Sequence, residues 1–258
     1  DKFEGKPLYQ KKLRLIEDRN EAARGKGLQE LLACCFSYIE LIDSMIGEVV
    51  TTLKQLELYD DTAILLTADH GDMAGSHGLR NKGAYMYDET YRIPMLLKPP
   101  GGSVAKRVSN PVNLMDVTAT MVHLMAGNQV LDIGSGELDG RSLLPLSAGE
   151  TEWYKTVNYS EYHGDWYGHY SSRMVTDGRW KLVWNLTDLS ELYDLEEDPH
   201  EMNNLFYESS YKQVRNDYIE ILREEGRRTG DGQIGHLFPE DTEHRLGQHI
   251  TGPLELSH

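Results

Sequence analysis

Apolar residues in the first hundred positions change from a helical to an extended spacing. Between Leu28 and Leu58 they recur at steps of three and four, as on one face of an amphipathic helix: Leu31, Leu32, Cys35, Ile39, Ile42, Ile46, Val49, Val50 and Leu53. Residues 62–68 and 92–98 are instead short aliphatic runs typical of strands, with Pro94 at an edge or at a strand start. The pattern predicts a long helix followed by the strands of an α/β fold.

Turn-forming residues divide the rest of the chain into shorter elements. We expect a helix over 116–125 that begins near Asn113 or Asp116 and ends at Gly127, and then a loop over 134–140. Short β-type runs follow, and Thr176-Asp177-Gly178 predicts a hairpin between the last two of the runs 156–162, 172–176 and 180–184. A helix is expected from Ser210 to Arg227, and the weakly periodic residues 230–258 are expected to extend over the surface.

Composition and charge narrow the class of protein. The 258 residues are 39% hydrophobic and 9% aromatic, which suits a folded chain with a core. No run of 18 apolar residues occurs, so no membrane span is expected. The 42 acidic and 26 basic residues give a net charge of −16, which opposes binding to nucleic acid and to anionic membranes. The two cysteines are neighbours, so a disulfide scaffold is excluded, and the compartment stays open.

The apolar run 63–68 leads directly into polar residues. It is followed by Asp69-His70-Gly71-Asp72, and then by residues 76–83, which include His77 and Lys82. The run is typical of a buried strand, and in open α/β sheets ligands bind at the carboxyl edge. Gly71 frees the backbone, so that Asp69 and His70 can both turn toward one cation. The alternative is that the Asp-His pair only caps the strand end.

These residues, together with Ile93-Pro94-Met95-Leu96, resemble the second half of a sulfatase of the alkaline phosphatase superfamily. Stretches 38–47, 113–120, 140–146 and 191–199 agree with the family in the same order, so the resemblance covers about Cys34 to Glu225. It implies that residues 1–150 are the C-terminal part of the α/β catalytic domain, with a mixed sheet sandwiched by helices. Residues 151–258 would form a small α+β subdomain, with an antiparallel sheet and a helix, and the tail.

The family's nucleophile is a formylglycine in a Cys/Ser-x-Pro/Ala-x-Arg motif, preceded by a pair of Asp residues that complete the metal site. This sequence contains neither, because Cys34-Cys35 is followed by Phe36-Ser37 within a helical pattern. Residue 1 is Asp and no initiator Met precedes it. We therefore expect the chain to be the C-terminal portion of a longer polypeptide, whose N-terminal half is its partner and supplies the formylglycine.

The resemblance also implies roles for single residues. Asp69 and His70 would be metal ligands; the family implies Ca²⁺, whereas an imidazole ligand suits Mn²⁺ or Zn²⁺ better. Lys82 would contact the sulfate. His77 would either protonate the leaving alcohol or form a hydrogen bond within its loop. Asp72 would either orient a ligand or cap the loop.

A polar-aromatic stretch at 162–170 is a further candidate. His163, Trp166 and His169 would contact the substrate, or else the stretch forms a subdomain interface. His123 and His200 are expected to be structural. The predicted function is metal-dependent hydrolysis of sulfate esters, on a sulfated small molecule or glycan. The alternatives are a phosphonate monoester or phosphodiester hydrolase of the same superfamily, and a non-catalytic binding fragment.

Overall fold

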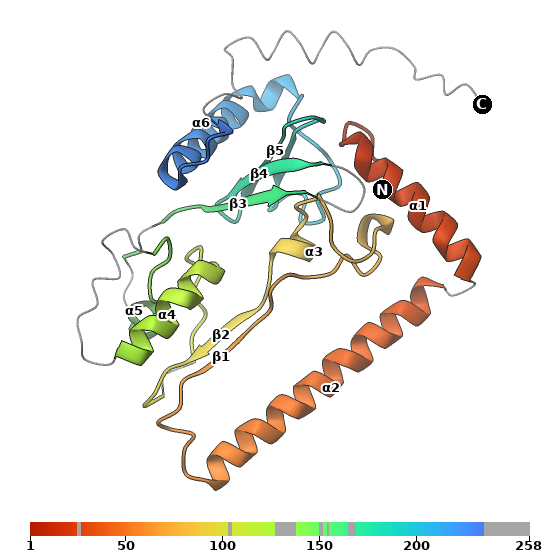
Figure 1. Cartoon of the computed structure of the whole chain (residues 1–258). Helices are drawn as coiled ribbons and strands as arrows, with labels where there is room; N and C mark the ends of the chain where they lie inside the picture. The colour runs from red at the N-terminus through yellow and green to blue at the C-terminus, as the bar shows by residue number, and fades with distance from the viewer. Residues whose placement is uncertain are drawn as a thin grey trace.

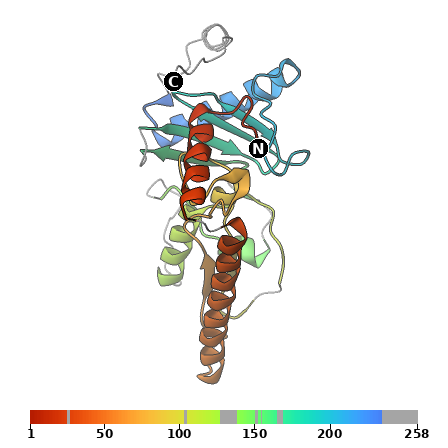
Figure 2. The same ribbon diagram turned by 90° about the vertical axis from the view of Figure 1, so that its right-hand side faces the viewer.

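The structure is a computed structural model that describes residues 1–24, 27–102, 105–126, 138–149, 152–153, 155–164 and 169–234. Its elements form two regions, which Figures 1 and 2 show one above the other. One region holds a four-stranded sheet with helices α1 and α6, and the other holds helix α2, a two-stranded sheet and helices α4 and α5. The described residues include no helix that is both long and apolar enough to cross a membrane.

Helix α2, Leu28–Gln55, confirms the helix predicted from the three- and four-residue spacing. It projects away from the four-stranded sheet (Figure 2), and none of its side chains is buried. Ile39, Met45 and Val49, which belong to its apolar stripe or lie beside it, are 62%, 58% and 61% exposed. The apolar stripe therefore has no covering partner among the described residues.

The two predicted strands are present as β1, Ile64–Thr67, and β2, Met95–Lys98. They pair antiparallel with Leu66 opposite Leu96, and Pro94 lies immediately before β2. The expectation that the first strand is buried is wrong for this structure, since its residues are half-buried or exposed and β2 is its partner in a two-stranded sheet. The short helix α3, Asp88–Tyr91, precedes β2.

Helix α4, Leu114–Ala126, matches the predicted helix, and Asn113 Oδ1 caps it by accepting a hydrogen bond from Met115 N at 3.1 Å. Asp116 is buried and accepts from the backbone N–H groups of Asn113 and Arg141. A side chain at Gly140 would overlap the Met115 carbonyl, so only glycine allows this approach. Helix α5, Leu144–Ala148, follows; part of the predicted loop over 134–140 lies outside the described residues.

The four-stranded sheet is an antiparallel meander in the order β3-β4-β5-β6. Its strands are β3, Asn158–His163; β4, Ser171–Thr176; β5, Trp180–Asn185; and β6, Glu191–Asp194. The predicted hairpin between β4 and β5 is confirmed, and Gly178 in its turn has a φ of 97°. Helix α6, Lys212–Thr229, follows a single 3₁₀ turn, Ser209–Tyr211, and packs its Leu222 against Val175, Leu182 and other apolar residues of the sheet.

Helix α1, Leu8–Arg24, was not predicted from the sequence, and a distant residue stabilises its beginning. The carboxylate of Asp188 accepts hydrogen bonds from Leu8 N at 3.0 Å and from Tyr9 N at 3.2 Å. Gln10 Nε2 also donates to the buried Glu191 of β6 at 3.0 Å. The first ten residues therefore pack against the four-stranded sheet, across the boundary expected near residue 150.

The residues after α6 are only partly described. The expectation of an extended surface tail is wrong for residues 231–234, because Ile234 is buried and Asp231 pairs with the buried Arg173. Residues 235–258 lie outside the described part.

Candidate functional site

A cavity of about 790 Å³ lies between the two regions of the chain. Asp69, His70 and Lys82 line it from the loops after β1, and residues of α3, β2 and the segment before α4 continue the wall. From the four-stranded sheet it receives Tyr159, Glu161, Tyr162, Met174 and Lys181, among others. The structure thus gathers three of the predicted site residues in one cavity.

His70 contacts both other members of this group. Its Nδ1 lies 2.8 Å from the carbonyl oxygen of Gly71, so Nδ1 carries the hydrogen and Nε2 is left as the acceptor. Nε2 lies 2.8 Å from the Nζ of Lys82 and 3.3 Å from the Oδ2 of Asp69. The contact with Gly71 therefore presents the Nε2 lone pair to a positive charge.

This arrangement fits a divalent cation in part. Two ligand atoms at right angles around a cation, each about 2.2 Å from it, lie about 3 Å apart, close to the separation of Asp69 Oδ2 and His70 Nε2. The ammonium of Lys82 already lies against the same nitrogen. Across the described ranges, no three His, Cys, Asp or Glu side chains are grouped as metal ligands. Asp69 and His70 can therefore hold a cation but do not complete its coordination shell.

The loop after β1 is held from its backbone. Gly71 N donates to the Thr90 carbonyl of α3 at 2.9 Å, and a side chain at Gly71 would overlap the carbonyl oxygen of Glu89. Asp72 is exposed and does not line the cavity; its Oδ1 accepts from Ala74 N at 2.7 Å, which is the geometry of the loop-capping alternative. Its role in orienting a metal ligand stays a prediction.

His77 lies apart from the cavity. Its ring is buried, stacks on Tyr87 with the centroids 3.9 Å apart, and has Nδ1 2.6 Å from Asp1 Oδ2. Burial and the nearby Lys6 ammonium lower the pKa of His77 to about 4, so its ring is neutral at pH 7. The structure does not bring His77 together with Lys82, and its role as proton donor stays a prediction.

The 162–170 stretch is described in part. His163 is exposed and its Nε2 lies 2.9 Å from Glu161 Oε2, while Trp166 lies outside the described residues. His169 is exposed, and neither described histidine lines the cavity. Their contact with a substrate stays a prediction. His123 Nδ1 lies 2.9 Å from Ser142 Oγ, a contact that suits the structural role expected for it.

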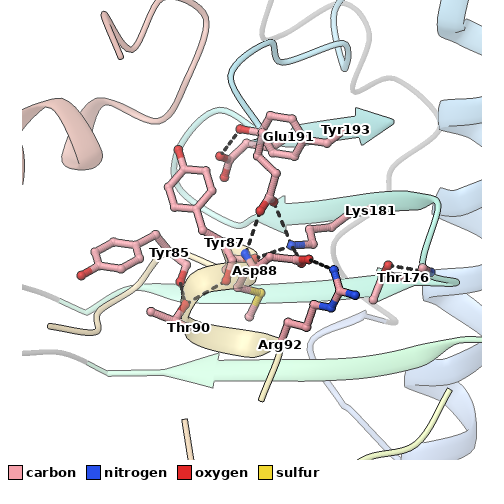
Figure 3. Close-up of polar contacts among 12 residues, drawn as sticks. Tyr85, Tyr87, Asp88, Thr90, Arg92, Thr176, Lys181, Glu191 and Tyr193 are labelled. Atoms are coloured by element: carbon pink, nitrogen blue, oxygen red, sulfur yellow. Dashed lines mark hydrogen bonds and ion pairs between the residues drawn. The ribbon is translucent and has the colours of Figure 1, made fainter. Parts of the chain in front are cut away.

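Sequence reasoning missed a buried ionic cluster of Lys181, Asp88 and Glu201 beside the cavity. Figure 3 shows Lys181 reaching from β5 to Asp88 at the start of α3. The only signal in the sequence was a lysine inside an apolar strand run, between Trp180 and Leu182. Its partners lie 93 and 20 positions away, so local patterns do not reveal them.

Comparisons with known proteins cover most of the chain. A family model described as N-sulphoglucosamine sulphohydrolase, C-terminal, matches residues 75–228, and a model described as Sulfatase matches residues 5–127. The uncharacterized sulfatase YidJ of Escherichia coli (strain K12) is 32% identical over 197 residues, which are 73% of this chain and 38% of that protein.

Solved structures resemble the chain as well. The crystal structure of a putative sulfatase from Bacteroides thetaiotaomicron has 28% sequence identity and a TM-score of 0.65, over 76% of this chain and 42% of that one. The phosphonate monoester hydrolase of Agrobacterium radiobacter has 27% identity and a TM-score of 0.60, over 70% of this chain and 38% of that one. The chain thus spans about two-fifths of the length of the proteins it matches.

Proposed function

Because this chain belongs to the sulfatase family of the alkaline phosphatase superfamily, we propose that it carries part of the site of a metal-dependent sulfate ester hydrolase. The similarity to solved sulfatase structures confirms the α/β fold class expected from the sequence. The observation that carries the functional proposal is the grouping of Asp69, His70 and Lys82 in one cavity.

Asp69 and His70 are the proposed metal ligands. Asp69 offers an anionic oxygen and His70 the Nε2 lone pair that its contact with Gly71 exposes. The family resemblance favours Ca²⁺, and the imidazole donor favours Mn²⁺ or Zn²⁺. When bound, the cation would supply positive charge that stabilises the oxygens of a sulfate group.

Lys82 is the proposed sulfate-binding residue. A neutral imidazole nitrogen has one lone pair, so Nε2 of His70 cannot serve Lys82 and a cation at the same time. Lys82 would therefore turn away from His70 in the metal-bound protein, and its ammonium would be available to a sulfate oxygen. In that position it would offset the charge that grows on the departing sulfate ester oxygen or its neighbours.

The nucleophile is proposed to come from polypeptide that is not part of this chain. No formylglycine motif occurs in the 258 residues, and the two proposed metal ligands that line the cavity are fewer than a cation needs. The apolar stripe of α2, which includes Ile39 and Val49, is not covered by any described residue, and this supports packing against such a segment. His77 is kept as the proposed proton donor for the leaving alcohol, and it would have to leave its buried position beside Lys6 and Asp1 to carry the proton.

An activity assay tests the proposal. The polypeptide that contains this chain should hydrolyse 4-nitrophenyl sulfate in the presence of Ca²⁺ or Mn²⁺ and lose this activity in a chelator. Similarity to the phosphonate monoester hydrolase supports a second candidate function on the same residues, so a phenylphosphonate monoester is assayed in parallel. Faster turnover of the phosphonate would replace the first proposal by the second, and turnover of neither would favour a non-catalytic binding role.

A further inference from the structure

We propose that Lys181 is a positioning residue for the Asp69, His70 and Lys82 site, which it reaches through helix α3. The proposal rests on the function proposed above, because it assigns to Lys181 the support of that site. The path runs from Lys181 to Asp88 and Glu201, along α3 to Thr90, and from the Thr90 carbonyl to Gly71, next to His70.

Lys181 is fully buried although it lies at the cavity wall. Its ammonium donates to Asp88 Oδ1, to Glu201 Oε1 at 2.8 Å and to the Met86 carbonyl at 3.2 Å. An ammonium has three hydrogens, so these acceptors use all of its donors and none is left for a substrate. Lys181 therefore acts on the site through the groups that it binds.

Both the side chain and the backbone of Asp88 are fixed by this cluster. Glu201 Oε2 accepts a hydrogen bond from Asp88 N at 2.7 Å, while Lys181 binds the Asp88 carboxylate (Figure 3). Glu201 is 1% exposed and is in turn held by Lys6, whose Nζ donates to the Glu201 carbonyl at 2.5 Å. The first residue of α3 is thus tied to the four-stranded sheet and to the loop after β6.

Helix α3 in turn fixes the position of the loop that carries Asp69 and His70. Thr90 is buried, its Oγ1 donates to the Tyr87 carbonyl at 3.0 Å, and its own carbonyl accepts from Gly71 N at 2.9 Å. Gly71 is packed so closely against Glu89 that no side chain fits there. Movement of α3 must therefore move Gly71, and with it the carbonyl that orients the ring of His70.

The site residues have little other support. The side chain of Asp69 is 85% exposed and that of His70 is 39% exposed, so packing does not fix them. Their positions depend on the backbone at Gly71. Removal of a group that orients a metal ligand without touching the metal typically weakens metal affinity by about 10- to 100-fold.

Hydrogen exchange of the Gly71 amide tests the path directly and needs no activity. Lys181→Met removes the ammonium and keeps a long apolar side chain. Arg173→Met is the matched control, because Arg173 is also fully buried, lies on the neighbouring strand β4 and pairs with Asp231 rather than with α3. Asp88→Ala is a second variant that removes the acceptor of Lys181 and breaks the same path if Lys181→Met does not fold, since Asp88 is 24% exposed.

At equal global stability, set by added denaturant, the Gly71 amide is expected to exchange at least tenfold faster in Lys181→Met and Asp88→Ala than in Arg173→Met. With the same substitutions in the polypeptide that contains this chain, Mn²⁺ titration should show about tenfold weaker binding in the first two variants only. Equal exchange at Gly71 in all three variants would overturn the proposal. If exchange changes as expected but the wild-type polypeptide that contains this chain binds no Mn²⁺, then the proposed function fails and the path to Gly71 stands.

Discussion

Lys82 Nζ lies 2.8 Å from His70 Nε2, so the residue proposed to bind sulfate and the residue proposed to bind metal share one lone pair. Cation binding and the Lys82 contact therefore exclude each other. Lys82→Met should tighten binding of Zn²⁺ or Mn²⁺ several-fold, because it removes both the competitor and a repelling charge. Calorimetric titration measures this, with the exposed Lys2→Met as control. Weaker binding by Lys82→Met would contradict the competition.

The two aspartates near the cavity should behave differently. Asp69→Ala should abolish both metal binding and metal-dependent activity in the polypeptide that contains this chain, since it removes a charged ligand. Asp72→Asn should keep both, because the amide oxygen can still accept the hydrogen bond from Ala74 N. Elemental analysis and kinetics on both variants check this. Full metal content in Asp69→Ala would remove Asp69 from the site.

The proposed roles of Lys82 and His77 can be distinguished by varying the leaving group of the substrate. Lys82→Ala should slow hydrolysis of every sulfate ester, because it acts on the group common to all of them. His77→Ala, if His77 is the acid, should slow alkyl or sugar sulfates much more than an activated aryl sulfate. Parallel measurement of kcat/KM on both classes decides. An equal loss on both would assign His77 to the packing with Tyr87 and Asp1 that the structure shows.

The stability of the fold should depend on the ionisation of Glu201. Burial raises the pKa of Glu201 to about 7, against the opposing effect of Lys181. A carboxyl group with a raised folded-state pKa contributes stability below its unfolded pKa and loses it as the pH rises through the folded pKa. Between pH 5 and pH 8 the wild type should therefore lose up to about 3 kcal/mol of unfolding free energy from this group. Glu201→Gln should not show this loss.

Denaturant unfolding at both pH values gives the comparison. The difference in unfolding free energy between wild type and Glu201→Gln should be more favourable to the wild type at pH 5 than at pH 8. A difference that does not vary with pH would mean that Glu201 is ionised throughout this range.

The isolated chain should not turn over sulfate esters. It has two proposed metal ligands in the cavity and no formylglycine motif. Purified residues 1–258, incubated with an aryl sulfate and Ca²⁺ or Mn²⁺, should release product no faster than buffer with the same metal. Repeated turnover would show that the nucleophile lies within this chain.

Local patterns predicted the elements that a single stretch of sequence determines. The spacing of apolar residues located α2 and α6, and the aliphatic runs located β1, β2 and the strands β3 to β5. The family resemblance placed Lys82 and His70 in one site, and the structure brings them into contact. The metal and the catalytic roles of these residues stay predictions.

Contacts between distant residues could not be predicted in this way. The beginning of helix α1 is held by Asp188, 180 positions after Leu8. Lys181 forms an ion pair with Asp88 of α3, and His77 contacts Asp1 and does not line the cavity. Each of these positions depends on where the second sheet lies, and no local spacing contains that information.

The cap of Asp188 on α1 also sets an order of events during synthesis. Leu8 and Tyr9 leave the ribosome long before Asp188 and strand β6 are made, so α1 begins with unpaired amide groups and its first turn lacks its partners. Bringing Leu8 and Asp188 together closes a long loop, and the entropy lost in closing it precedes the favourable contacts that compensate for it. Docking of the N-terminal segment is therefore a late step of folding, and polypeptides that stop before β6 leave this segment open to chaperones and proteases.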